Sequence, residues 1–268
     1  MATMVGPVGT IAVSGTAGHL GPFVLDALAA RGPAGQAVMS LDADVVPHLR
    51  GVSTVVHLGE TPDTRRLLVA ADRAAVTTVV LLSGAAVYGA WSDNPVPLPE
   101  VAPLRPNPGA SWPTELAERE RLLAEWRDGA DGRRAVVLRP TVIVDGAHQG
   151  GPARRLAGLG RVRVRGANRP VQAVHGRDVA AAVALAVAGG LDGAYNVAPD
   201  GWVRNETALA LVGPKLRVSL PARVAAPFLR LPRGLAPYTV HPWVVANDRL
   251  RAAGWVPAFS NEDALLLA

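Results

Sequence analysis

Short apolar runs alternate with longer segments of helical periodicity along the first half of the chain. The runs have the length and the β-branched content of buried strands; they are residues 10–13, 37–41, 54–58, 77–82 and 134–138. The segments with apolar residues at helical spacing are 22–31, 62–75 and 113–127, and the first of them stops at Gly32-Pro33. This alternation predicts an α/β fold with a Rossmann-type, doubly wound parallel sheet.

Between the first strand and the first helix lies a glycine-rich loop. Gly15 permits a tight turn, Gly18 lets the backbone approach a phosphate, and Gly21 lets helix and strand pack closely. The N-terminus of the following helix offers N–H groups and a partial positive charge to an anion. The pattern predicts a loop that binds the pyrophosphate of a dinucleotide, formed by Gly15, Thr16, Ala17, Gly18, His19, Leu20 and Gly21.

Composition and charge exclude several classes of protein. The chain has no cysteine, which excludes disulfides, thiolate nucleophiles and cysteine-ligated metals, and the spacing of its histidines predicts no metal site. The first strand begins within about ten residues of the start, and no apolar run approaches the ~18 residues of a membrane span. We therefore expect a cytoplasmic protein with no membrane segment.

The net charge of +5 comes almost wholly from arginine, because Lys215 is the only lysine. Arginines cluster at positions 154, 155, 161, 163, 165 and 169, and some of them alternate with Val162 and Val164 as in a half-exposed strand. No aromatic residues interleave for base stacking, so a solvated strand face is favoured over a nucleic-acid surface. The expected partner is a small-molecule substrate, with no prediction about the oligomeric state.

Further segments stand in a characteristic order after the glycine loop: Val55–Gly59, Leu82–Gly89, Leu138–Thr141, Val174–Asp178, Gly193–Val197 and Gly254–Pro257. Together they resemble the extended and atypical branch of the short-chain dehydrogenase/reductase superfamily, the NAD-dependent epimerase/dehydratase-like proteins. The resemblance covers nearly the whole chain. It implies that Leu58 and Gly59 contact the cofactor and that Pro140 and Thr141 lie beside its nicotinamide. It also assigns the last two segments to a C-terminal lobe.

This organisation predicts two parts. Residues 1–145 are expected to form a dinucleotide-binding Rossmann domain. Residues 146–268 are expected to be a mixed segment that completes the core, through a helix at 176–187, and forms a small C-terminal substrate lobe. Residues 91–113, which are rich in Pro, Asn and Asp, are expected to be a long loop that covers a site.

The family's catalytic motif is missing at the aligned positions. In the family, a Tyr and a Lys four residues later work with a Ser or Thr, so that the phenol exchanges a proton while hydride moves. The alignment of Ala117–Glu120 places Trp112 at the Tyr position and Leu116 at the Lys position, and Gly84 stands where the Ser or Thr belongs. A small misalignment would not restore the motif, because no tyrosine lies between Tyr88 and Tyr195.

Three residues stay as weak catalytic candidates. Tyr88 is the nearest phenol, although a structural or substrate-lining role is more usual in the family. Ser111 is most simply a helix cap. The indole of Trp112 does not titrate usefully, but it can stack on a flat substrate or serve in packing. His57 is expected to be a packed residue at a strand end.

The choice between NAD and NADP stays open. Asp42 follows the glycine loop by about 20 residues, where an acid binds the ribose 2′-hydroxyl and favours NAD. The stretch from Asp42 to His57 is short for the family, so Asp42 also fits an adenine-side contact or a surface turn.

The sequence predicts an NAD(P)H-dependent ketoreductase of atypical mechanism. The proton would come from water, from a side chain that the motifs do not identify, or from the substrate itself. The last source would suit an aromatic polyketide-like ketone whose own phenol is hydrogen-bonded to the carbonyl. Two alternatives stay open: a catalytically inactive cofactor-binding sensor or regulator, and a nucleoside-sugar epimerase or dehydratase. The missing Tyr weakens the last alternative most, because an epimerase needs the same proton exchange.

Overall fold

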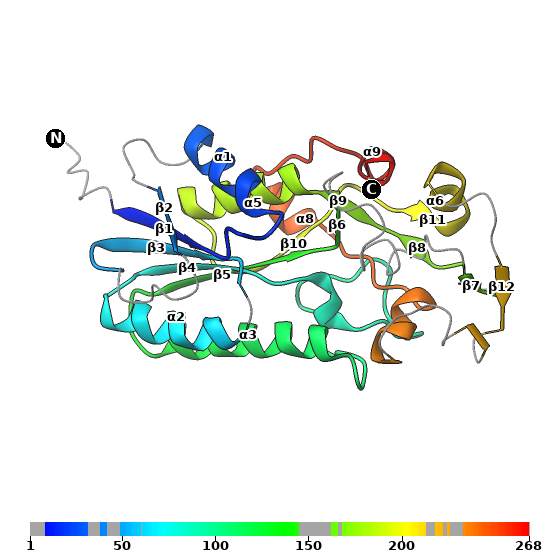
Figure 1. Cartoon of the computed structure of the whole chain (residues 1–268), viewed down its shortest axis with the longest axis horizontal. Helices are drawn as coiled ribbons and strands as arrows, with labels where there is room; N and C mark the ends of the chain where they lie inside the picture. Colours follow the sequence, from blue (N-terminus) through cyan, green and yellow to red (C-terminus); the bar gives the residue numbers. More distant parts are fainter. Residues whose placement is uncertain are drawn as a thin grey trace. The chain divides into compact units, whose positions relative to one another are not determined.

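The computed structural model describes residues 9–31, 38–41, 49–59, 61–144, 162–165, 168–212, 218–221, 224–225 and 233–267 (Figure 1). The chain divides into two compact units, each assembled from three stretches. Unit 1 comprises residues 1–82, 118–138 and 180–194, and unit 2 comprises residues 83–117, 139–179 and 195–268. The boundary predicted at residue 145 lies outside the described residues, and the division there stays a prediction.

The main sheet has the strand order β10-β5-β4-β3-β1-β2. Its strands are β1 (Thr10–Ser14), β2 (Val38–Leu41), β3 (Val52–His57), β4 (Thr78–Leu82), β5 (Arg134–Pro140) and β10 (Gly193–Val197). Neighbours from β2 to β5 pair in parallel, with Ala12 opposite both Met39 and Val55. The chain adds β2 on one side of β1 and β3 on the other, which confirms the predicted Rossmann-type, doubly wound fold. Ligands of such sheets bind where the strand order reverses, here at the carboxyl ends of β1 and β3.

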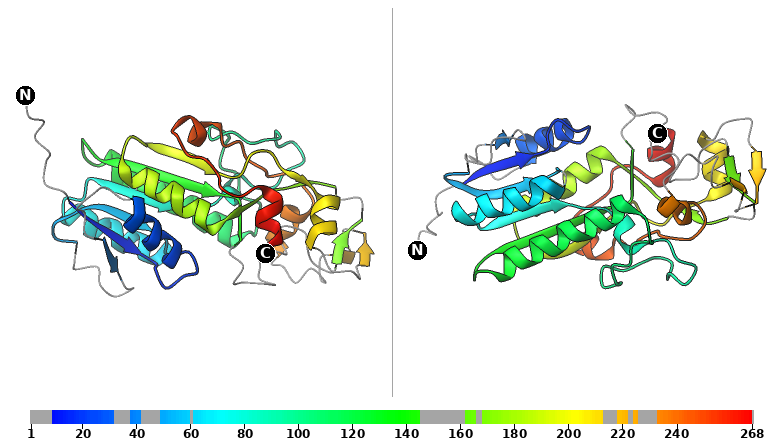
Figure 2. Two further views of the ribbon diagram at one scale, coloured as in Figure 1. Left: turned by 90° about the horizontal axis from the view of Figure 1, so that it is seen from above. Right: turned by 60° about the horizontal axis from the view of Figure 1, so that its bottom comes forward.

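Helices cover both faces of the sheet in unit 1 (Figures 1 and 2). The helices α1 (Gly21–Arg31) and α5 (Gly176–Ala188) lie on one face, and α2 (Thr61–Arg73) and α3 (Ser111–Asp128) lie on the other. The core on the α2–α3 face contains Leu67 and Leu68 of α2 and Leu122, Leu123 and Trp126 of α3, packed with Val55, Val79 and Val137 of the sheet. Each fully buried leucine contributes about 1.5–3 kcal/mol relative to an exposed one.

Unit 2 contains shorter elements around its own core. The helical ones are η2 (Ala85–Tyr88), α6 (Asn205–Val212), η3 (Arg233–Thr239), α8 (Asp248–Ala252) and α9 (Asn261–Leu266). The strand pairs are β6 (Val142–Val144) with β9 (Ala173–His175), β8 (Pro170–Val171) with β11 (Val203–Arg204), and β7 (Val162–Val164) with β12 (Val218–Leu220). The core includes Tyr88, Leu116, Tyr238, Trp243 and Leu265.

The helices predicted at 22–31, 62–75, 113–127 and 176–187 are present as α1, α2, α3 and α5. Two expectations need correction. Residues 193–197 are not part of a separate lobe but form β10, at the edge of the main sheet. Arg169 does not belong to a solvated strand face, because it is buried, and burial lowers the pKa of its guanidinium to about 10.

Within the described part of the chain, no helix is both long and apolar enough to cross a bilayer.

Candidate functional site

The turn at Gly15 in unit 1 requires glycine for two reasons. Its φ is +79°, which lies in the left-handed region that L side chains avoid. A Cβ atom at this position would lie only 2.7 Å from the amide nitrogen of Gly59 and 2.8 Å from the carbonyl carbon of Leu58. The turn after β1 is therefore packed against the segment after β3, so the predicted cofactor residues 15, 58 and 59 lie together at the strand-order reversal.

The rest of the loop folds tightly onto the start of α1. The amide of Gly18 donates to the carbonyl oxygen of Gly15 (3.2 Å), and the amide of Gly21 donates to that of Gly18 (3.0 Å). A Cβ atom at residue 21 would lie 1.9 Å from the carbonyl oxygen of Thr16, so only glycine fits there. Ala17, Gly18 and His19 are exposed, whereas Leu20 is buried. Exposed backbone in front of a helix N-terminus is an arrangement that can bind an anion.

A buried histidine holds three parts of unit 1 together beneath this loop. His57 Nδ1 lies 2.7 Å from Ser14 Oγ, at the end of β1, and His57 Nε2 lies 2.6 Å from Thr64 Oγ1, in the first turn of α2. Burial, and secondarily the positive charge of Arg119, lowers the pKa of His57 to about 3. The ring is therefore neutral at physiological pH. Because both of its nitrogens are engaged, this geometry favours a positioning role over direct catalysis.

In unit 2 the structure brings together the three positions that the resemblance aligned with the catalytic motif. A Cβ atom on Gly84 would lie 3.2 Å from Leu116 Cδ1 and 4.0 Å from Trp112 Cζ2. The carbonyl oxygen of Pro140, the last residue of β5, would lie 3.8 Å away. Leu116 is buried, whereas Trp112 is 42% exposed. Gly84 has no side chain and neither Trp112 nor Leu116 is a titratable acid or base, so the cluster is apolar apart from one exposed indole.

Tyr88 has a buried, fully engaged hydroxyl. The hydroxyl donates to Asn196 Oδ1 (2.8 Å) and accepts from Arg139 Nη1 (2.7 Å), while the Arg139 guanidinium also lies 5.0 Å from the centre of the tyrosine ring. The side chain of Tyr88 is only 1% exposed. These contacts favour the structural role. The aligned motif did not predict the partners Arg139 and Asn196, which are distant in sequence.

Three more of the predicted site residues have defined places, and one does not. Ser111 is the exposed first residue of α3. Pro140 and Thr141 are buried, and the amide of Thr141 donates to the carbonyl oxygen of Val197 (3.2 Å). Asp42 lies outside the described residues, so the structure does not separate its possible roles.

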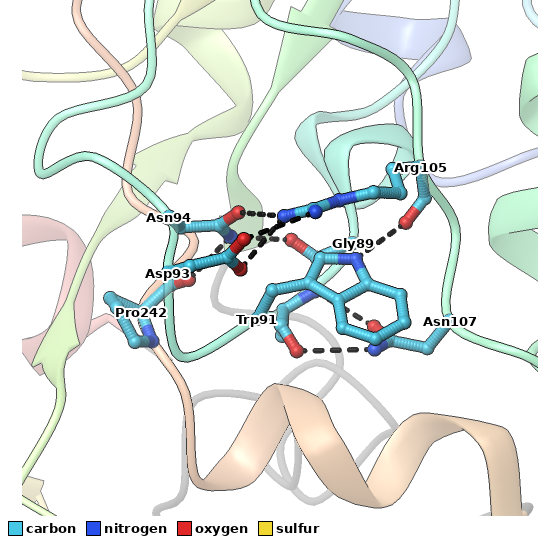
Figure 3. A network of polar contacts seen from close by, with 8 residues as sticks. Gly89, Trp91, Asp93, Asn94, Arg105, Asn107 and Pro242 are labelled. Atoms are coloured by element: carbon cyan, nitrogen blue, oxygen red, sulfur yellow. Dashed lines mark hydrogen bonds and ion pairs between the residues drawn. The ribbon is translucent and has the colours of Figure 1, made fainter.

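The loop that leads into α3 is fixed by its own contacts (Figure 3). The Arg105 guanidinium forms an ion pair with Asp93 (2.9 Å) and lies 4.9 Å from the centre of the Trp91 ring. Asn94 donates to the carbonyl oxygens of Gly89 and Pro242 (both 2.9 Å), and Asn107 exchanges two hydrogen bonds with the backbone of Ala90. Contacts within unit 2 therefore tie residues 89–94 to Arg105, Asn107 and Pro242 in the loop that precedes α3.

Comparisons with known proteins bear on the fold. No protein-family model matches the sequence, and no curated protein matches it. Among solved structures, similar folds include UDP-glucose 4-epimerase of Thermus thermophilus in complex with NAD, with 22% identity, coverage of 96% of this chain and 97% of that one, and a TM-score of 0.72. A short-chain dehydrogenase/reductase superfamily protein of Agrobacterium tumefaciens with bound NAD has 22% identity, coverage of 96% and 94%, and a TM-score of 0.75.

A human epimerase family protein with NADPH has 20% identity, coverage of 96% and 98%, and a TM-score of 0.74. In each case the likeness spans nearly the whole of both chains. The chain therefore has the Rossmann-type fold found in these epimerase-like and short-chain dehydrogenase/reductase structures.

Proposed function

We propose that the protein is an atypical NAD(P)H-dependent ketoreductase of the short-chain dehydrogenase/reductase type. One observation supports the proposal: Gly84, Trp112 and Leu116, which the resemblance aligns with the family's proton-transfer residues, lie together in unit 2 and carry no titratable side chain. The same chain keeps the glycine loop in unit 1 with its backbone geometry intact. The combination favours a protein that binds a hydride donor and obtains its proton from elsewhere.

The described residues fit a dinucleotide. Gly15 and Gly21 cannot carry a side chain without a clash, and the backbone between them is exposed in front of α1. Residues 15–21 would hold the pyrophosphate, with Leu58, Gly59, Pro140 and Thr141 as further contacts that the resemblance implies. Solved structures of this fold carry NAD or NADPH. The bound cofactor would supply a hydride to a carbonyl carbon.

The proton for the carbonyl oxygen has no evident source among the side chains at the aligned positions. An indole N–H does not titrate usefully, leucine carries no charge, and the Tyr88 hydroxyl is committed to Asn196 and Arg139. We propose a ketone that carries its own neighbouring phenol. As hydride adds to the carbon, the carbonyl oxygen takes the phenolic proton, and the resulting phenolate regains a proton from water.

Such a substrate is flat, aromatic and hydroxylated, as in aromatic polyketides. The indole of Trp112, which is 42% exposed and lies beside the buried Gly84, provides a surface on which a flat ring can stack. Aromatic pairs of this kind contribute about 0.5–1.5 kcal/mol beyond the area that they bury. A protein of this kind would resemble the angucyclinone ketoreductase of simocyclinone biosynthesis, which belongs to the atypical branch of the family.

The test uses paired substrates. Purified protein is incubated with NADH or NADPH and a hydroxylated quinone-type ketone, or the same ketone with its neighbouring phenol methylated. We expect the phenolic ketone to oxidise the cofactor. The methyl ether should react at least about 100-fold more slowly, because general-acid catalysis contributes a factor of at least that order. Equal rates would contradict proton transfer from the substrate.

Two variants test the recognition surface. Trp112→Ala is expected to raise KM for the aromatic ketone by about 2- to 10-fold, given the stacking energy. Trp202→Ala, which removes an indole of the same exposure (43%) elsewhere in unit 2, is the matched control and should leave KM unchanged. Tight cofactor binding with no oxidation by any ketone would instead support the sensor alternative, and interconversion of sugar nucleotides without net cofactor oxidation would support the epimerase.

A further inference from the structure

Arg119 is a buried cation in unit 1 that the proposed reaction does not use. It is only 6% exposed, although Arg121, two residues later on α3, is exposed. It follows Leu116 by three residues and precedes Leu122 and Leu123 by three and four residues, and all three leucines are buried. Residues at this spacing share one helix face, so Arg119 lies on the inward face of the helix.

The direction of α3 places this residue toward the ligand edge of the sheet. The helix leads into β5, which runs parallel to β4, so α3 runs antiparallel to the strands and begins near their carboxyl ends. Leu122, Leu123 and Trp126 pack on Val55 and Val79, within the sheet. Arg119 lies one turn closer to the carboxyl edge, where β1 ends in the glycine loop and β3 ends at His57.

The electrostatics of His57 agree with that placement. The positive charge of Arg119 is the second cause, after burial, of the lowered pKa of His57. His57 contacts Ser14, the residue directly before Gly15. Arg119 therefore lies near a residue that contacts the end of β1, directly before the glycine loop.

A buried guanidinium keeps its positive charge, because the group does not lose its proton at physiological pH. The low local dielectric around a buried charge strengthens its interaction with an anion. A dinucleotide brings the negative charges of its diphosphate to the carboxyl edge of the sheet, where β1 and β3 end. Arg119, on the inward face of α3 and one turn before Leu122 and Leu123, would therefore place a positive charge that stabilises this ligand.

We propose that Arg119 supplies the buried positive charge that stabilises the diphosphate of the bound dinucleotide, as a binding residue of the cofactor site. The inference rests on the proposed function only for the presence of a dinucleotide cofactor. It does not depend on the substrate or on the source of the proton.

The test measures binding rather than turnover. Affinities for NADH, NADPH and ADP-ribose, which has the diphosphate but no nicotinamide, are measured by titration calorimetry. The proteins are the wild type, Arg119→Met, Arg119→Gln and Arg119→Lys, with Arg121→Met as the exposed control on the same helix. Arg119→Met and Arg119→Gln should weaken every ligand that the wild type binds by tenfold or more, on the order of one charge-assisted contact. Arg119→Lys and Arg121→Met should stay within about threefold of the wild type.

The outcomes separate the two proposals. A wild type that binds none of the three ligands would overturn the proposed function. A wild type that binds them, with Arg119→Met or Arg119→Gln unchanged in affinity, would overturn only the role of Arg119. If the uncharged variants do not fold, Arg119→Lys decides: a tenfold loss of affinity in a folded Arg119→Lys protein would overturn a role for the positive charge alone.

Discussion

The glycine loop of unit 1 and the Gly84–Trp112–Leu116 cluster of unit 2 are built in different ways. The loop is made of backbone: Gly15 and Gly21 leave no space for a Cβ atom, so almost any substitution disturbs the fold. The cluster is made of side chains on an ordinary helix and an extended residue, since Gly84 has φ −171°. A function that depends on backbone shape is tied to the fold, whereas one that depends on side chains can be lost or replaced while the fold persists.

The largest expected effect comes from adding one methyl group to the loop. In Gly21→Ala the new Cβ would lie 1.9 Å from Thr16 O, so the loop or the start of α1 must move. We expect a loss of stability of about 2–4 kcal/mol and of dinucleotide affinity by more than about 100-fold. Urea denaturation and NADH titration measure the two effects.

Gly132→Ala is the matched control for this substitution. Gly132 has φ +78°, but a Cβ atom there meets nothing within 4 Å. It should cost about 1 kcal/mol in stability and leave affinity unchanged. If Gly21→Ala behaved like Gly132→Ala, the loop would not depend on the close backbone contact.

A smaller effect is expected from acid, through His57. Its pKa is about 3 in the folded protein, below the usual 6.5, so the unfolded chain binds the proton more readily. The stability contributed by the neutral ring is present above pH 6.5 and falls as the pH drops toward 3, by up to about 1.4 kcal/mol per pH unit. Urea denaturation between pH 7 and pH 5 should therefore give a shallower pH dependence for His57→Gln than for the wild type. Parallel slopes would show that His57 is not held neutral.

The smallest effect is expected where side chains are restored to the cluster. The double variant Gly84→Ser/Trp112→Tyr is expected to be structurally mild. The one tight neighbour of a Cβ at Gly84 is the flexible end of Leu116, at 3.2 Å, the other two neighbours lie at ordinary contact distance, and Trp112 is exposed. If the substrate brings its own proton, turnover of the phenolic ketone should change by less than about threefold. A rise of tenfold or more, measured as cofactor oxidation, would indicate that the wild type lacks a proton source even with this substrate.

The sequence predicts those elements whose conformation depends only on neighbouring residues in the chain. Glycine spacing predicts the loop because only glycine satisfies its backbone. Buried apolar runs predict β1, β3, β4 and β5 because a parallel strand is covered on both faces. The alignment of Gly84 with Trp112 and Leu116 was also within reach, since the family motifs fix the spacing.

The parts that could not be predicted depend on distant partners. Arg169 stands in a run of arginines that suggests an exposed surface, yet the packing of unit 2 buries it. The contacts of Tyr88 join residues more than fifty positions apart. Arg119 was missed for another reason: its charge suggests exposure, and only its spacing from Leu116, Leu122 and Leu123 signals the inward face.

The interleaving of the two units along the chain has a consequence for how such a protein can change. Each unit is assembled from three separate stretches, so no single cut or crossover exchanges one unit while it leaves the other intact. Recombination of whole modules is therefore a poor route to new chemistry in this architecture. Single amino-acid substitutions at exposed positions such as Trp112 can instead change the chemistry while both units stay intact.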